Sequence, residues 1–160
     1  MAYYTIPRYE GKTEGNRIIW ETAGELVYIE PYGRDAIRFR SSKSLHIDEA
    51  LNWTLEEPAS PEGVIIEADD EKACMTNGKI QVTITGDGTV TYRNTRTGKV
   101  LLEEYWIDGR VHTAPLRRAR EYRVTSGNQF KISLYFKAEP GEHFYGMGQD
   151  ANDCFDLKGS

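Results

Sequence analysis

Five carboxylates gather near the C-terminal end of the sequence, and they are the side chains best suited to acid–base chemistry. They are Glu139, Glu142, Asp150, Asp153 and Asp156. Hydrolysis of a glycosidic bond needs two carboxylates that face one bond from about 5–9 Å apart. Proximity in a loop does not create that geometry, because acidic loop residues commonly form turns. We therefore predict no catalytic pair and assign no catalytic residue.

A glycine-rich segment lies among these acids, and its residues Gly146–Ala151 fit the spacing of a dinucleotide-binding fingerprint. That fingerprint needs a helix beginning at the glycines and an acidic residue about 20 positions later. The sequence reaches Ser160 before either feature is complete. We interpret the glycines as close backbone packing at a strand end, and we expect no cofactor.

The potential metal ligands are scattered. His46, His112 and His143 lie far apart, and Cys74 and Cys154 belong to no closely spaced pair. A zinc site uses closely spaced histidines and cysteines, so we predict no metal site. The first residues contain no apolar signal-peptide core, which favours a cytoplasmic protein with two free thiols over a disulfide.

The three tryptophans are candidates for stacking on a sugar ring. Trp20 and Trp106 lie within strand-like patterns and are expected in the core. Trp53 lies in an irregular segment and is the candidate for an exposed sugar contact. A single stacking contact predicts carbohydrate binding no tighter than about 1 mM.

Four arginines, Arg117, Arg118, Arg120 and Arg123, form a basic cluster beside Glu121. One interpretation is an edge strand whose charges resist edge-to-edge pairing. Another is a salt-bridged interface with a neighbouring domain. The net charge of −5 disfavours a nucleic-acid partner or an anionic membrane surface. No run approaches the ~20 apolar residues of a membrane-spanning helix.

Alternation with a period of two marks the elements that position these residues. Ile80, Val82 and Ile84 alternate with polar residues, and Gly86–Gly88 then forms a turn before the strand at Val90 and Tyr92. Further strands are expected at 17–21, 26–30, 36–40, 64–68, 72–76 and 100–107. Phe130, Ile132, Leu134 and Phe136 give another strand with one apolar face.

About ten strands, with no convincing helical stripe, predict an all-β antiparallel sandwich with little or no helix. The ambiguous segment 45–55 is closed off by prolines. Residues 1–16 are expected to form an arm or edge strand, and residues 17–160 the sandwich.

Several segments together resemble the N-terminal domain of glycoside hydrolase family 31. Residues 26–40 are similar to an early strand pair of that family, and residues 76–84 with 98–101 to its central hairpin. The strongest match is Phe136–Gln149, and Asp156–Gly159 follows at a suitable distance. Family members often carry Leu where Met147 stands and Glu where Gln149 stands, which leaves the substrate open.

This resemblance implies a galactose-mutarotase-like supersandwich that packs on a catalytic barrel. It also implies a retaining α-glycosidase acting on α-glucosides or α-xylosides, with its catalytic carboxylates beyond Ser160. Gln149, Asp150, Asp153 and Phe155 are then candidates for the active-site rim or the barrel interface. The alternatives are a free-standing carbohydrate-binding module and a structural interaction domain.

The last residues are not a polar tail, since Phe155 and Leu157 have apolar side chains suited to packing. We expect a domain truncated at this end, and an isolated chain that self-associates through uncovered apolar surface.

Overall fold

A computed structural model describes residues 8–22, 24–44, 46–50, 55–56, 61, 63–105, 118–127, 129–143 and 145. Within these residues the chain forms eleven strands and no helix. The strands are β1 (Lys12–Glu14), β2 (Arg17–Thr22), β3 (Glu25–Pro31), β4 (Ile37–Ser42), β5 (Ile65–Ala68), β6 (Lys72–Asn77), β7 (Ile80–Thr85), β8 (Val90–Asn94), β9 (Val100–Glu103), β10 (Arg120–Ser126) and β11 (Gln129–Leu134). The described part contains no helix that could cross a membrane.

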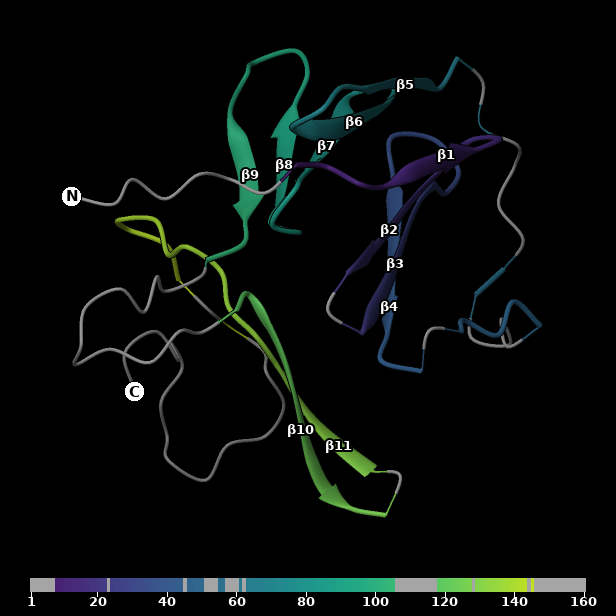
Figure 1. Ribbon diagram of the computed structural model, residues 1–160. Helices are drawn as coiled ribbons and strands as arrows, with labels where there is room; N and C mark the ends of the chain where they lie inside the picture. Colours follow the sequence, from purple (N-terminus) through teal and green to yellow (C-terminus); the bar gives the residue numbers. More distant parts are fainter. Residues whose placement is uncertain are drawn as a thin grey trace, which may run out of the picture.

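The strands form three antiparallel groups (Figure 1). β1 to β4 make a four-stranded sheet in chain order, with β1 at its edge, and β5 to β9 make a five-stranded sheet, also in chain order. β10 and β11 form a two-stranded ribbon. In both sheets, strands that follow each other in the chain also lie side by side, as is expected when short turns join antiparallel strands. The all-β antiparallel prediction is confirmed.

The core lies between the two larger sheets. The four-stranded sheet contributes Ile18, Trp20, Val27 and Ile29, and the five-stranded sheet contributes Ala73, Met75, Val82, Ile84 and Val90. Val82 and Ile84 are fully buried, which confirms the predicted inward face of β7. Burial of each such isoleucine or valine side chain stabilises the fold by about 1.5–3 kcal/mol. Trp20 is also a core residue, as expected, with 2% of its surface exposed.

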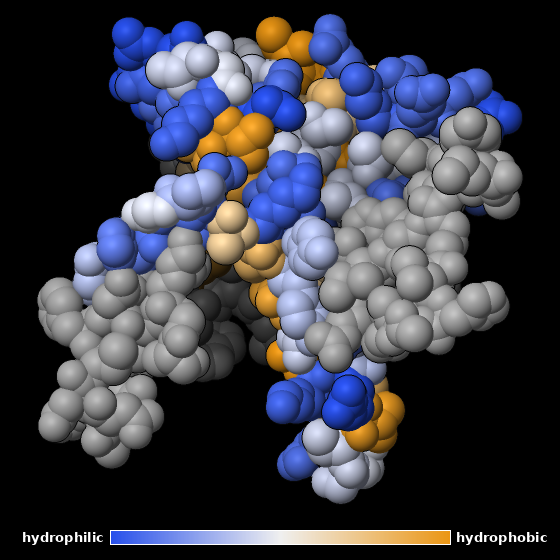
Figure 2. All heavy atoms as spheres, turned by 90° about the vertical axis from the view of Figure 1, so that its left-hand side faces the viewer, coloured by the Kyte–Doolittle hydropathy of each residue, from blue (hydrophilic) through white to orange (hydrophobic). Residues whose placement is uncertain are grey.

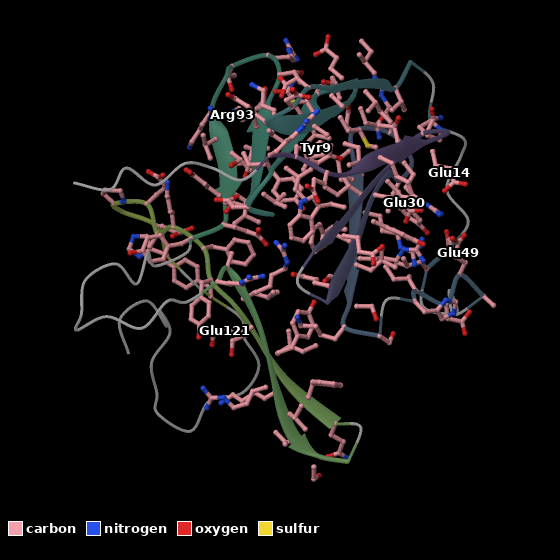
Figure 3. All side chains as sticks on the ribbon, in the orientation of Figure 1. Tyr9, Glu14, Glu30, Glu49, Arg93 and Glu121 are labelled. Carbon is pink, nitrogen blue, oxygen red and sulfur yellow. The ribbon has the colours of Figure 1, made fainter. Side chains whose placement is uncertain are left out.

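The outer face of the four-stranded sheet carries a charged network. The Arg17 guanidinium bonds Glu30 of β3 and Glu49 of the following loop, and Arg40 bonds Glu30 from the other side. Both guanidinium groups lie over the Tyr28 ring, Arg17 at 4.4 Å from its centroid. Figure 3 shows Glu30 and Glu49 on the same side of the molecule. These contacts tie the described part of the loop between β4 and β5 onto the sheet.

A polar joint connects the two sheets at one end. The buried Asn77 side chain donates to the carbonyl oxygens of Gly33 and Ala36 at 2.9 and 2.7 Å. The Lys79 backbone N–H donates to Asp35 Oδ1 at 2.7 Å. This backbone hydrogen bond is the main reason that the pKa of Asp35 lies below its usual value, and the Lys79 and Arg34 charges add to the effect.

We expect Asp35→Asn to weaken the pH dependence of stability. A carboxylate whose pKa is lowered in the folded state stabilises the fold above its unfolded pKa, near ~3.9. That contribution is lost as pH falls through the folded value. The unfolding free energy from urea titrations should therefore fall less between about pH 5 and pH 2.5 in the variant. An identical decline in both proteins would contradict this role for Asp35.

The ribbon of β10 and β11 departs from the sequence-based expectation. It extends away from the two sheets in Figure 1, and the apolar face expected for residues 130–136 is only partly covered. Phe130, Ile132 and Leu134 are each about half exposed. β9 is shorter than predicted and is followed by an isolated bridge between Glu104 and Phe136.

Candidate functional site

A buried ionic cluster joins the ribbon to both larger sheets. Arg120, the first residue of β10, donates from Nε to Glu25 Oε1 at 2.7 Å and from Nη1 to Glu104 Oε2 at 2.5 Å. Its Nη2 donates to the carbonyl oxygen of Gly88 at 2.9 Å. The three charged side chains are at most 5% exposed. We call Glu25, Glu104 and Arg120 the ionic clamp.

The residues of the clamp lie in or next to strands of all three sheets. Glu25 begins β3, and Glu104 lies just beyond β9. The Arg120 guanidinium also lies over the ring of Phe39 in β4, 5.2 Å from its centroid. Because Arg has five donors in a fixed planar fork, it can satisfy two carboxylates and a carbonyl at once.

Neutral groups complete the hydrogen bonding of the two carboxylates. Ser41 Oγ donates to Glu25 Oε1 at 2.6 Å and lies 2.5 Å from the Tyr122 hydroxyl. The Val90 backbone N–H donates to Glu104 Oε2 at 2.9 Å. Buried charges are tolerated when they are paired and hydrogen-bonded in this way.

Burial sets the electrostatics of the clamp. Loss of hydration raises the pKa of Glu104, although Arg120 opposes that effect. Burial by itself lowers the pKa of Arg120. The charges and hydrogen bonds of Glu104 and Glu25 together raise it by a larger amount, so the pKa of Arg120 lies above its usual value. Because the folded pKa of Glu104 is raised, its contribution to stability is greatest below its unfolded pKa and falls as pH rises through the folded value.

The clamp is not arranged for hydrolysis. A pair of catalytic carboxylates needs a substrate bond between them. Here the Arg120 guanidinium bonds both carboxylates, and all three side chains are closed to solvent. The geometry supports a structural role, holding the ribbon against the sandwich.

Sequence reasoning did not find this clamp. It grouped Arg120 with the exposed arginines of an edge strand, whereas the structure buries Arg120 and leaves Arg118 and Arg123 exposed. The edge-strand interpretation is therefore wrong for Arg120. The available signal was the pair Glu103 and Glu104, two charged residues within an apolar and aromatic run at 100–107.

The five-stranded sheet carries a polar hollow of about 700 Å³ on its outer face. Thr83, Thr85 and Thr91 line it, together with Arg93, which Figure 3 labels. Cys74, a free thiol, also faces it, with Sγ 3.2 Å from Thr83 Oγ1. The lining contains no aromatic ring of the kind that stacks on sugars. The hollow therefore gives no support to carbohydrate binding.

The remaining candidates from the sequence are placed as follows. Trp53, Gln149, Asp150, Asp153 and Phe155 all lie outside the described residues.

Glu139 and Glu142 close a tight turn, in which the Glu139 N–H donates to Glu142 Oε2 at 3.2 Å. Gly141 in that turn has a φ of 78°, which glycine adopts at little cost. These two acids therefore belong to a turn. Within the described part, no group of His, Cys, Asp or Glu side chains could hold a metal ion.

Comparisons with known proteins identify the domain. The family model described as the glycosyl hydrolase 31 N-terminal galactose mutarotase-like domain matches residues 26–160. The uncharacterized family 31 glucosidase ORF2 of Pseudescherichia vulneris is 29% identical over 157 residues, which cover 90% of this chain and 29% of that protein.

A solved structure is similar along nearly the whole chain. It is a GH31 alpha-xylosidase from a soil metagenome, complexed with xylose, and it matches with a TM-score of 0.79 and 27% identity. The match covers 94% of this chain and 24% of that chain. This chain thus spans 29% of the length of the first relative and 24% of the second. The chain belongs to the glycosyl hydrolase 31 N-terminal galactose mutarotase-like domain family.

Proposed function

We propose that this chain is the non-catalytic N-terminal domain of an α-glycosidase that acts on α-glucosides or α-xylosides. In the proposal it packs on the catalytic barrel of its parent and shapes the rim of the active site. The observation that carries the proposal is the match of nearly the whole chain to about a quarter of a GH31 alpha-xylosidase. In addition, the carboxylates of the buried clamp are closed to any substrate.

The edge of the five-stranded sheet at β9 is the surface that we assign to the barrel. Leu101 and Leu102 of β9 are 51% and 39% exposed, and Tyr105, two residues beyond its end, is 44% exposed. Figure 2 views the molecule from this side and shows apolar residues at the surface among hydrophilic ones. A patch of apolar side chains with a polar surround is typical of an interface. Interfaces between domains of one chain are commonly of this mixed character.

A chimera tests the proposal. This chain would replace the matching quarter of the soil-metagenome alpha-xylosidase, and hydrolysis of aryl α-xylosides would be measured. We expect activity in the chimera and none in the isolated chain. Leu101→Arg should lower the chimera's thermal stability by several degrees, because it places a charge in the proposed interface. Leu101→Met keeps that surface apolar and should have little effect.

Two results would contradict the proposal. One is turnover by the isolated chain that is lost on Asp150→Ala or Glu142→Ala, which would make this chain an enzyme in its own right. The other is a folded, active chimera in which Leu101→Arg and Leu101→Met behave alike, which would exclude this side of β9 as the interface.

A further inference from the structure

The ionic clamp holds more negative than positive charge. The carboxylates of Glu25 and Glu104 converge on the single guanidinium of Arg120. All three side chains are at most 5% exposed, so water does little to stabilise the charge that is left over. A buried ionised group without a matching charge commonly becomes neutral by binding a proton. One of the two carboxylates is therefore a candidate for protonation.

Glu25 is the better stabilised of the two carboxylates. Its Oε1 accepts from Arg120 at 2.7 Å and from Ser41 Oγ at 2.6 Å, and the Tyr122 hydroxyl lies 3.5 Å away. Lys43 adds a positive charge on this side of the clamp, with Nζ 5.5 Å from the centroid of the Tyr122 ring. Hydrogen bonds and nearby positive charge both favour the ionised form of a carboxyl group. Glu25 is therefore the carboxylate better placed to stay ionised.

Glu104 is the better site for the proton. Its Oε2 accepts from Arg120 and from the Val90 backbone N–H. Tyr92 of β8 also faces this carboxyl, but burial raises the pKa of Tyr92 to about 12, so its phenol is neutral and supplies no positive charge. Burial likewise raises the pKa of Glu104. Because Oε2 already accepts from two donors, an added proton belongs on Oε1.

The clamp is a joint through which the ribbon of β10 and β11 meets the two larger sheets. Arg120 begins β10, Glu25 begins β3, and Glu104 follows β9. Beyond this base the ribbon extends away from the sheets (Figure 1), and Val124 toward its tip is 63% exposed. The strength of the clamp therefore bears directly on how firmly the ribbon is docked.

We propose that the ionic clamp is a pH-sensitive joint, which binds one proton from solvent at Glu104 when it closes and loosens the ribbon when that proton is lost. Protonation leaves one carboxylate for one guanidinium, so the three side chains then carry no net charge. Loss of the proton restores a buried excess of negative charge, which favours opening of the joint toward water. Since the closed form binds more protons than the open form, opening must increase as pH rises.

Amide exchange of the full chain from about pH 5 to pH 8, corrected for the intrinsic exchange rate, tests the proposal. In the wild type, the opening constant of the amides in β10 and β11 should rise at least about fivefold across this range. Glu104→Gln keeps the shape of the side chain without its charge, so its opening constants should be nearly independent of pH. Glu103→Gln is the matched control. Glu103 is the adjacent residue, partly exposed and paired with Lys137, and its variant should behave like the wild type.

Carboxyl ¹³C NMR of the wild type provides a readout that needs no variant. The side-chain carboxyl of Glu104 should titrate with a midpoint above the usual glutamate value of about 4.3. A midpoint at or below that value would overturn the proposal. So would a rise of less than about fivefold in the wild-type opening constants, or the same pH dependence in the Glu103→Gln and Glu104→Gln variants. These measurements use the chain alone, so they are independent of the barrel interface proposed above.

Discussion

Replacement of Arg120 by alanine is expected to lower the free energy of unfolding by about 3–5 kcal/mol. Removal of the guanidinium leaves the carboxylates of Glu25 and Glu104 close together in a site closed to solvent. The Gly88 carbonyl also loses its hydrogen bond from Nη2. Whole domains are commonly stable by only about 5–15 kcal/mol, so this loss is a large fraction of the total. Urea titration followed by circular dichroism measures it.

Arg118→Ala is the matched control for this prediction. Arg118 lies two residues earlier and is exposed, so its removal should change stability by no more than about 0.5 kcal/mol. A second comparison adds Glu104→Gln to Arg120→Ala. Because the amide removes one unpaired charge, the double variant should recover part of the lost stability. A double-mutant cycle of the two single variants and the double variant then measures the coupling between Arg120 and Glu104. Equal stability of the Arg118→Ala and Arg120→Ala proteins would show that the clamp contributes nothing.

The sheets of this domain could be predicted from local patterns. The alternation at Ile80, Val82 and Ile84 fixes which side of β7 is buried, because neighbouring side chains in a strand point to opposite faces. The glycine turn before Val90 then sets the hairpin of β7 and β8, and the structure pairs Ile84 with Val90 as that turn requires. These features depend on residues close together in the sequence.

The ionic clamp could not be predicted in this way. Glu25 and Arg120 are 95 positions apart, and no local pattern indicates that they meet. A run of arginines has the same composition on an exposed edge as at a buried joint. Only the arrangement of three sheets around one point distinguishes Arg120 from Arg118.

The ribbon of β10 and β11 shows a second limit of local patterns. Alternation along β11 correctly predicts that one face is apolar, but it does not say what covers that face. The four-stranded sheet covers the base of the ribbon through Ser41 and Tyr122, and along β10 the exposed fraction rises from 6% at Arg120 to 63% at Val124. The extent of a neighbouring sheet depends on tertiary structure. The candidates Trp53, Gln149, Asp150, Asp153 and Phe155 remain sequence-based hypotheses.

Substitution of Gly88 by alanine is expected to destabilise the domain by about 2–4 kcal/mol. Gly88 has a φ of 84°, a left-handed conformation that side chains with a Cβ rarely adopt. A Cβ placed there would lie 2.6 Å from Cζ2 of Trp20, well inside van der Waals contact. The Trp20 ring is buried between the two sheets and cannot move away without disturbing the core. Any shift of the Gly88 backbone would also move the carbonyl that accepts from Arg120.

Gly98→Ala separates the two causes of this loss. Gly98 has a φ of 69° in the turn between β8 and β9, and a Cβ there would meet no atom within 4 Å. The Gly98 variant therefore carries the backbone cost alone, about 1 kcal/mol. The difference between the two variants, measured by urea titration, isolates the clash with Trp20, and a Trp20→Phe background should reduce that difference. Equal losses at Gly88 and Gly98 would mean that the indole ring moves freely, and that the core does not depend on the close approach of this turn.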